Sequence, residues 1–186
     1  PSFSVYYCNV AHLLYAKGEI DEAIKYYQNA ITLSPNRSTT GVLAQMLGYV
    51  FHQSGENLDA AICAYQNAQS LIPYDMDTYI SLGSVFYDKG DYQNALSIYK
   101  LALGLDPKNA RIHCNLAYLL WGLGEIDESV KEYKLALKYD NVYAIAYNNL
   151  GVIYLDDLGR VQNAIEMFKK AVEYNPNYAL AHFNLA

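Results

Sequence analysis

The chain has 186 residues, of which 53% are hydrophobic and 17% are charged, and its formal net charge is −6 at pH 7. A chain of this length and apolar content can bury a core without metals, and its three widely spaced cysteines are a poor disulfide framework. Because the balance is acidic and no basic run is present, we expect no nucleic-acid partner.

The first predicted element is a pair of helices over residues 4–37. Gly18 stands between the two halves, where a residue with left-handed backbone can end the first helix. In the second half Tyr27 and Ala30 lie three residues apart, so they share one helix face. Pro35 follows and cannot continue an established helix. This stretch therefore predicts a helical hairpin.

The same pattern returns along the whole chain. The alanine that follows an aromatic residue by three positions recurs at intervals of 38, 34, 34 and 35 residues, in the pairs Tyr27 and Ala30, Tyr65 and Ala68, Tyr99 and Ala102, Tyr133 and Ala136, Phe168 and Ala171. Later hairpins are expected over residues 41–75, 76–109, 110–143 and 144–178, with a sixth beginning at 179–186.

Each repeat combines small and large residues at positions where its two helices should cross. In the third repeat Gly83 and Ala95 leave room beside the large Tyr99. Gly48 and Gly151 occupy the position of Gly83 in other repeats. The fifth repeat has one extra residue in the segment LDDLG, which we interpret as a longer loop.

This frame resembles the tetratricopeptide repeat, whose pattern is W-x2-L-G-x2-Y, then A-x3-F, then P. The resemblance covers essentially the entire chain. It implies an all-α, right-handed superhelical solenoid of antiparallel helix hairpins, one solenoid over 1–186, whose first helices line a concave groove that takes partner proteins. The truncated last helix, from Ala179, should expose an apolar edge that favours end-to-end self-association.

Positions on the first helices that are not used for packing should face this groove. They form an aromatic and amide-rich set with few charges, suited to a protein or peptide in extended conformation. The set comprises Asn9, His12, Tyr15, Tyr49, His52, Tyr87, Arg111, Asn115, Tyr118, Trp121, Asn148, Asn149 and Asn184.

Asparagine recurs at one groove position in four of the six repeats, as Asn9, Asn115, Asn149 and Asn184. A side-chain amide can both donate to and accept from a peptide backbone. This ladder is similar to that of O-linked N-acetylglucosamine transferases, and it is interrupted at Met46 and Ser81. It predicts a peptide site centred on Asn115 and Asn149, flanked by Tyr118 and Trp121. A second interpretation is that these asparagines only tie one first helix to the next.

The family's other recognition mode, a clamp of basic residues around an acidic C-terminus, is absent. One set of its lysine positions holds Cys8, Ile80, Cys114 and Asn148. A partner chosen for a carboxylate tail is therefore not expected.

We find no catalytic motif, and we predict neither an enzyme activity nor a cofactor. Cys8 and His12 could share one helix face, but two ligands do not make a metal site. No apolar stretch approaches the roughly 18 residues that span a bilayer, so we expect a cytoplasmic protein that does not bind membranes. The predicted function is an adaptor or scaffold that binds an extended peptide. The alternatives are the substrate-recognition region of a larger enzyme, such as a glycosyltransferase, and a self-assembling structural scaffold.

Overall fold

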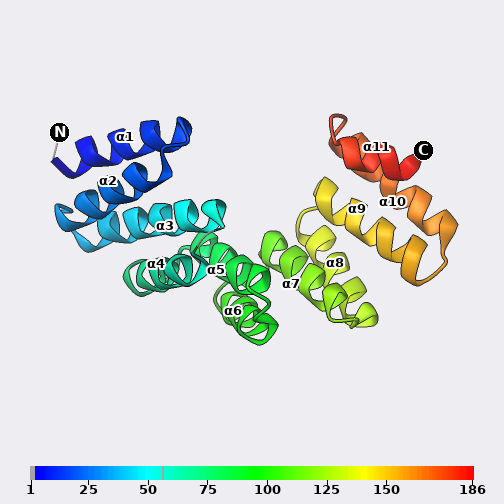
Figure 1. The fold of residues 1–186 in the computed structure, drawn as a ribbon. Coiled ribbons are helices and arrows are strands. Elements are labelled where there is room, and N and C mark those ends of the chain that lie inside the picture. The colour runs from blue at the N-terminus through cyan, green and yellow to red at the C-terminus, as the bar shows by residue number, and fades with distance from the viewer. Residues whose placement is uncertain (1–2, 56) are drawn as a thin grey trace. The chain divides into compact units, whose positions relative to one another are not determined.

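The computed structural model describes residues 3–55 and 57–186. Within these ranges the protein consists of eleven α-helices and one π-helical segment, without a strand (Figure 1). The predicted all-α fold of helix hairpins is confirmed. None of the helices in this part of the chain is both long and apolar enough to cross a bilayer.

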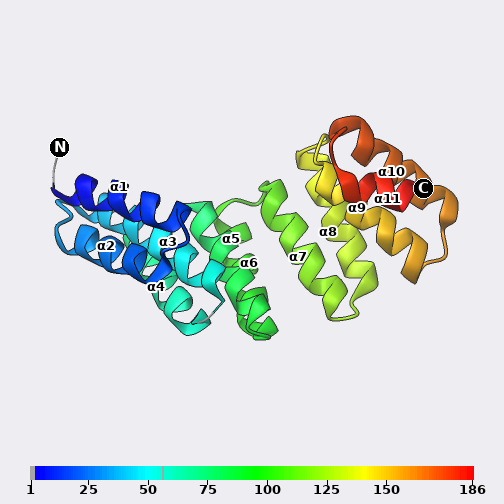
Figure 2. The same cartoon turned by 45° about the horizontal axis from the view of Figure 1, so that its top comes forward.

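The chain divides into two compact units, Pro1–Ile98 and Tyr99–Ala186. The described part of the first contains α1 (Phe3–Ala16), α2 (Ile20–Thr32), α3 (Arg37–Ser54), α4 (Leu58–Leu71), α5 (Met76–Asp88) and the start of α6 (Tyr92–Leu105). Helices α1 and α2 pack as one hairpin and α3 and α4 as the next, and α2 also packs on α3 (Figure 2).

The second unit begins within α6 and continues with α7 (Ala110–Gly122), α8 (Ile126–Tyr139), α9 (Ala144–Val152), the π-helical segment η1 (Ile153–Asp157), α10 (Val161–Tyr174) and α11 (Ala179–Leu185). Helix α7 pairs with α8, and α9 pairs with α10. Helix α11 then packs mainly on α10.

The hairpin turns form where the sequence places glycine. Gly55 ends α3 with φ 69°, a left-handed conformation that glycine adopts without steric cost. Gly18, the turn glycine predicted in the first hairpin, also has positive φ, and so do Gly90, Gly124 and Gly159 between the helices of later hairpins. Polar caps support the helix starts. Asn36 and Asn109, for example, accept backbone N–H bonds from Thr39 and Ile112.

The recurring aromatic and alanine residues form the core of each hairpin. Tyr65, Tyr133 and Phe168 are at most 1% exposed. A Cβ atom on Gly48 would lie 2.9 Å from the ring of Tyr65, and one on Gly151 would lie 2.6 Å from Phe168. The predicted pairing of small and large residues is therefore confirmed at both positions.

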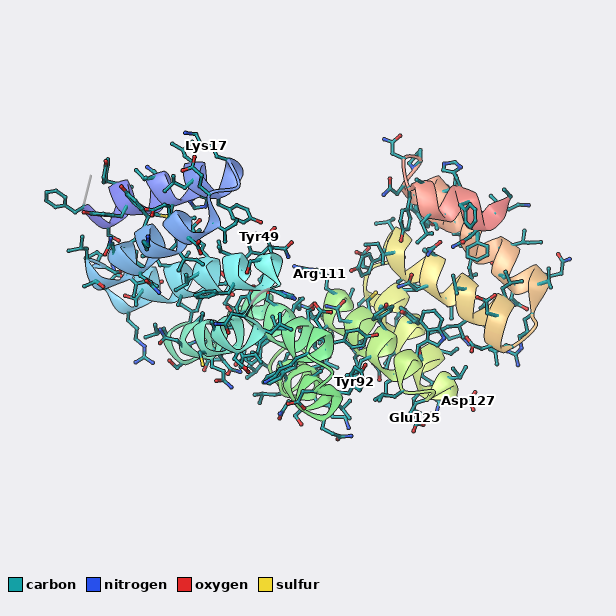
Figure 3. The ribbon with its side chains drawn as sticks, viewed as in Figure 1. Lys17, Tyr49, Tyr92, Arg111, Glu125 and Asp127 are labelled. Atoms are coloured by element: carbon teal, nitrogen blue, oxygen red, sulfur yellow. The ribbon has the colours of Figure 1, made fainter. Side chains whose placement is uncertain are left out.

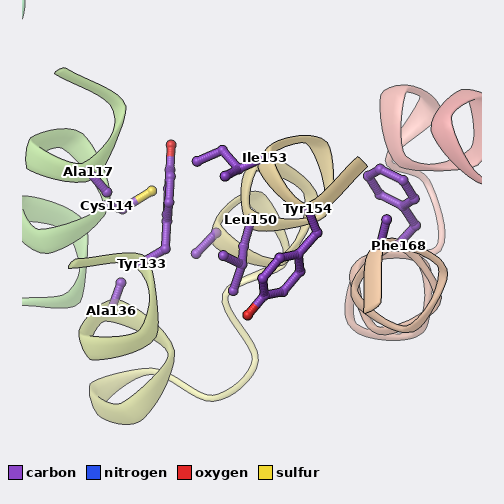
Figure 4. Close-up of a cluster of buried hydrophobic side chains, with 10 residues drawn as sticks. Cys114, Ala117, Tyr133, Ala136, Leu150, Ile153, Tyr154 and Phe168 are labelled. Atoms are coloured by element: carbon purple, nitrogen blue, oxygen red, sulfur yellow. The ribbon is translucent and has the colours of Figure 1, made fainter. Parts of the chain in front are cut away.

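Figure 4 shows how this packing continues between hairpins of the second unit. The ring of Tyr133 lies between Cys114 and Ala117 on one side and Leu150 and Ile153 on the other. The aromatic residue thus fills the space inside its own hairpin and also contacts the next one.

The extra residue of LDDLG was expected to lengthen a loop, and this expectation is wrong. The chain instead widens into the π-helical segment η1, where Leu158 N–H donates to the carbonyl of Ile153 five residues earlier, at 3.1 Å. A π turn absorbs one extra residue without breaking the helix. The insertion therefore changes the end of the first helix of the hairpin.

Candidate functional site

A cavity of about 310 Å³ opens on the first unit. Nine side chains from α1 to α5 line it: His12, Tyr15, Tyr27, Gln45, Met46, Tyr49, Val50, Tyr65 and Ser81. None of these residues is an aspartate, glutamate, lysine or arginine. We call this cavity the N-terminal pocket. It brings together three residues predicted to face the groove, namely His12, Tyr15 and Tyr49, and Figure 3 shows Tyr49 on α3.

Aromatic rings in edge-to-face contact form much of the pocket wall. The ring centroids of Tyr15 and Tyr49 lie 5.8 Å apart at 64°, and those of His12 and Tyr27 lie 5.6 Å apart at 70°. Burial, followed by a side-chain hydrogen bond with Tyr49, raises the pKa of Tyr15. Burial also raises the pKa of Tyr27 and Tyr65 to about 12. These three phenols are therefore neutral at physiological pH.

Two further side chains of the pocket, Gln45 and His12, form hydrogen bonds with groups outside it. Gln45 Nε2 donates to the carboxylate of Asp75 at 2.7 Å, so its Oε1 is left as an acceptor. His12 Nδ1 lies 3.0 Å from the carbonyl oxygen of Cys8. A carbonyl can only accept, so the neutral ring carries its proton on Nδ1, and Nε2 is also an acceptor.

Other predicted groove residues of the first unit lie outside the lining of this pocket. His52 Nε2 pairs with Asp88 Oδ2 at 2.6 Å, which connects α3 to α5. The ring of Tyr87 packs against that of Tyr92 at 5.4 Å. Asn9 is exposed on α1.

In the second unit, α7 presents a separate group of predicted residues. Tyr118 is 43% exposed, and its ring lies 6.0 Å from that of Trp121. Trp121 Nε1 donates to Asp157 Oδ2 at 2.8 Å and so connects α7 to η1. Arg111 is exposed at the start of α7 (Figure 3). Asn115, one turn further along this helix, is half-buried.

The remaining predicted asparagines form a chain of side-chain hydrogen bonds. Asn184 donates to Asn148 Oδ1 at 2.9 Å, and Asn148 donates to Asn149 Oδ1 at 3.2 Å. Asn149 then donates to the hydroxyl of Tyr133, also at 3.2 Å. Asn148 is only 1% exposed. For Asn148 and Asn184, this geometry matches the second interpretation, in which asparagines tie one first helix to the next.

Several residues that line the pocket are not among those predicted from the sequence. Gln45, Met46 and Ser81 stand at groove positions, and Met46 and Ser81 interrupt the asparagine ladder. Tyr27 and Tyr65 are the recurring aromatic residues that pack inside their hairpins, and they also border the pocket. Helical spacing alone would have found the first three.

No group of three or more His, Cys, Asp or Glu side chains in the described ranges could hold a metal ion. Cys8 Sγ and His12 Nδ1 lie 3.6 Å apart, as their shared helix face suggested. They remain a pair without a third ligand.

Models of the tetratricopeptide repeat match most of the chain. Three of them cover residues 4–37, 83–124, and 114–179 together with 154–186. No curated protein matches the sequence significantly.

Solved structures with the same fold cover nearly all of the chain. One structure of MamA has 24% sequence identity and a TM-score of 0.72, covering 91% of this chain and 96% of its own. A thermophilic repeat protein of Thermus thermophilus has 21% identity and a TM-score of 0.74, covering 98% and 96%. YrrB, described as having an unusual peptide-binding site, has 24% identity and a TM-score of 0.64, covering 95% and 89%. These similarities establish the fold.

Proposed function

Because this chain is a tetratricopeptide-repeat protein, we propose that it is a protein-interaction module that holds an extended segment of a partner protein against its first helices. It acts by binding and has no catalytic role of its own.

The N-terminal pocket carries this proposal. It joins side chains from the first helices of three successive hairpins, such as Tyr15, Tyr49 and Ser81. An apolar concavity with a few polar groups is the usual form of a recognition site, and large aromatic residues are the usual anchors of an interface. The peptide-binding site described for YrrB, a protein of the same fold, supports this use of the fold.

A second surface, on α7, is a separate candidate for peptide contacts within the second unit. Asn115 is predicted to form hydrogen bonds with the backbone of a bound peptide. It is half-buried, and no hydrogen bond from its side chain to another described residue is found. Tyr118 beside it is exposed and could pack against apolar side chains. Of the predicted ladder in this unit, we therefore propose Asn115 as a peptide contact and Asn184 as a structural tie, together with its partner Asn148 outside the ladder.

A display library of unstructured peptides, selected on the immobilised protein, tests the proposal. We expect enriched peptides to bind with one-to-one stoichiometry in calorimetry. Tyr49→Ala should weaken the binding of peptides that occupy the first unit, and Asn115→Ala should weaken that of peptides that occupy α7. Because Tyr49 is 47% exposed, its replacement should leave the helical circular dichroism spectrum unchanged. Failure to enrich any peptide, or binding that neither substitution weakens, would refute the proposed function.

Self-association is a second candidate function, favoured by the exposure of α11. Phe183 is 78% exposed and Leu180 is 51% exposed. Exposed apolar side chains of this size favour protein contacts. Light scattering over a range of concentrations should then show a mass increase that Phe183→Ser abolishes. A constant monomer mass at high concentration would exclude this candidate.

A further inference from the structure

We infer that the N-terminal pocket is an anchor pocket for one large, uncharged aromatic side chain that carries a hydrogen-bond donor, with tryptophan as its preferred occupant. The inference rests on the proposed function, because the side chain would belong to the bound partner segment. It goes further by naming the residue type that the pocket selects.

The size of the pocket favours a single side chain. Its volume of about 310 Å³ lies at the lower end of the range for ligand pockets, about 300 to 1,000 Å³. A cofactor with several rings would need more space. One indole ring and its methylene group fit the lower end of that range.

The pocket wall favours an aromatic occupant without charge. Tyr15, Tyr27, Tyr49 and Tyr65 place ring edges and faces around the cavity, and Met46 adds a polarisable sulfur. An inserted ring could make edge-to-face and sulfur–aromatic contacts with them. A carboxylate or ammonium group would lose its hydration there, because no lining residue offers an opposite formal charge.

Two polar groups of the pocket favour an occupant that donates a hydrogen bond. Gln45 Oε1 and His12 Nε2 are both acceptors, since their neighbouring nitrogens are engaged with Asp75 and Cys8. The indole N–H of tryptophan is a donor only and would satisfy one of them. A leucine or phenylalanine side chain would bury an acceptor without a partner, and a site of this kind rejects such occupants.

Methyl signals of methionine provide a direct test, because the chain has only three methionines. Met46 lines the pocket, whereas Met76 begins α5 and Met167 packs in the second unit. We would label the methionine methyl groups with 13C and titrate the protein with N-acetyl-L-tryptophanamide. The ring current should shift the Met46 signal and leave those of Met76 and Met167 in place. An unmoved Met46 signal, or equal shifts of all three signals, would overturn the inference.

Selectivity is tested with matched amides. The N-acetyl amides of phenylalanine, leucine and aspartate should bind more weakly than that of tryptophan, and aspartate should not bind measurably. Gln45→Met keeps the side-chain length but removes the acceptor, so it should reduce the preference for tryptophan over phenylalanine. Equal affinities of the leucine and tryptophan amides for the wild-type protein would contradict the inference.

The pocket variant and its control separate this inference from the proposed function. Tyr49→Leu should lower the affinity for the tryptophan amide about tenfold, equivalent to about 1.4 kcal/mol. Tyr74→Leu, at an 81% exposed tyrosine that does not line the pocket, should leave its affinity unchanged. Library peptides could bind through Asn115 although the tryptophan amide leaves the Met46 methyl signal in place. That result would overturn the anchor pocket but not the proposed function. A shift of Met46 without any peptide binding would refute the proposed function and leave the aromatic pocket standing.

Discussion

Asn184 and Asn148 are joined by a hydrogen bond of 2.9 Å between their side-chain amides, which connects α11 to α9 across 36 positions of sequence. Asn148 is almost completely buried, and its own amide nitrogen donates to Asn149. Equivalent asparagines of this repeat family were expected to face a peptide. In this pair the amides satisfy each other, so their main contribution is to the stability of the second unit.

Replacing Asn148 by alanine should therefore destabilise the protein. The change removes the acceptor of Asn184 and the donor to Asn149 at a buried position, which costs about 1 to 3 kcal/mol. Urea unfolding followed by circular dichroism measures the loss. Asn115→Ala is the matched control and should change the free energy of unfolding by less than about 0.5 kcal/mol. Equal losses for the two variants would show that Asn115 is also a structural tie.

Alanine substitutions at three helical glycines should have opposite effects. At Gly48 a Cβ atom would lie 2.9 Å from the ring of Tyr65, and at Gly151 one would lie 2.6 Å from Phe168. Such overpacking typically costs about 1 to 3 kcal/mol. Gly104 in α6 has no such neighbour within 4 Å, so Gly104→Ala should stabilise the protein by about 0.5 to 1 kcal/mol through helix propensity. Thermal unfolding would rank the three variants, and a stabilising Gly48→Ala would contradict the packing described for the first unit.

Stability should fall at alkaline pH because the buried tyrosines resist ionisation. Burial raises the pKa of Tyr27 and Tyr65 from 10.0 to about 12. Since the folded state holds these protons more tightly, the stabilisation is complete below about pH 10 and is lost as the pH rises towards 12. A shift of this size corresponds to about 2 to 3 kcal/mol per tyrosine on an order-of-magnitude basis.

Urea midpoints measured from pH 9 to about pH 12 would test this dependence. Tyr65→Phe should lower stability at neutral pH through the lost hydrogen bond with Ser81, yet weaken the alkaline dependence. An unchanged slope in this variant would argue against Tyr65 as a source of the effect.

The three cysteines should react with iodoacetamide at different rates. Cys63 is exposed, Cys8 is half-buried and Cys114 is buried. Burial raises the pKa of Cys8, and it raises that of Cys114 to about 12. The thiolate is the reactive form, so at pH 8 we expect modification first at Cys63, then at Cys8, and at Cys114 only after unfolding. Peptide mass spectrometry over time measures the order, and rapid labelling of Cys114 in the folded protein would contradict the packing beside Tyr133.

Much of the fold could be predicted because its signals are local and repeated. Tyr133 and Ala136 share a helix face whatever surrounds them, and Gly124 can end a helix whatever follows. The π turn at Ile153 could not be predicted in this way. One extra residue can enter either a loop or a helix, and packing around the helix end decides between them.

Less of the candidate site than of the fold could be predicted from the sequence. Helical spacing placed His12, Tyr15 and Tyr49 on one surface, and the structure brings them together in a pocket. Spacing also places Gln45 and Met46 on this surface, but the asparagine ladder, which Met46 interrupts, favoured a site in the later repeats.

The sequence by itself determined the repeat, the hairpins and the small-to-large packing inside them, because these depend on residues only a few positions apart on a helix or on two helices joined by a short turn. Only the tertiary structure decided which polar side chains are used internally and which can meet a ligand. Asn115 and Asn149 hold the same position in successive repeats, but Asn149 is bonded to Tyr133 and to Asn148, and Asn148 in turn to Asn184. Hydrogen bonds form between atoms about 3 Å apart, and how separate helices pack determines which amides come that close.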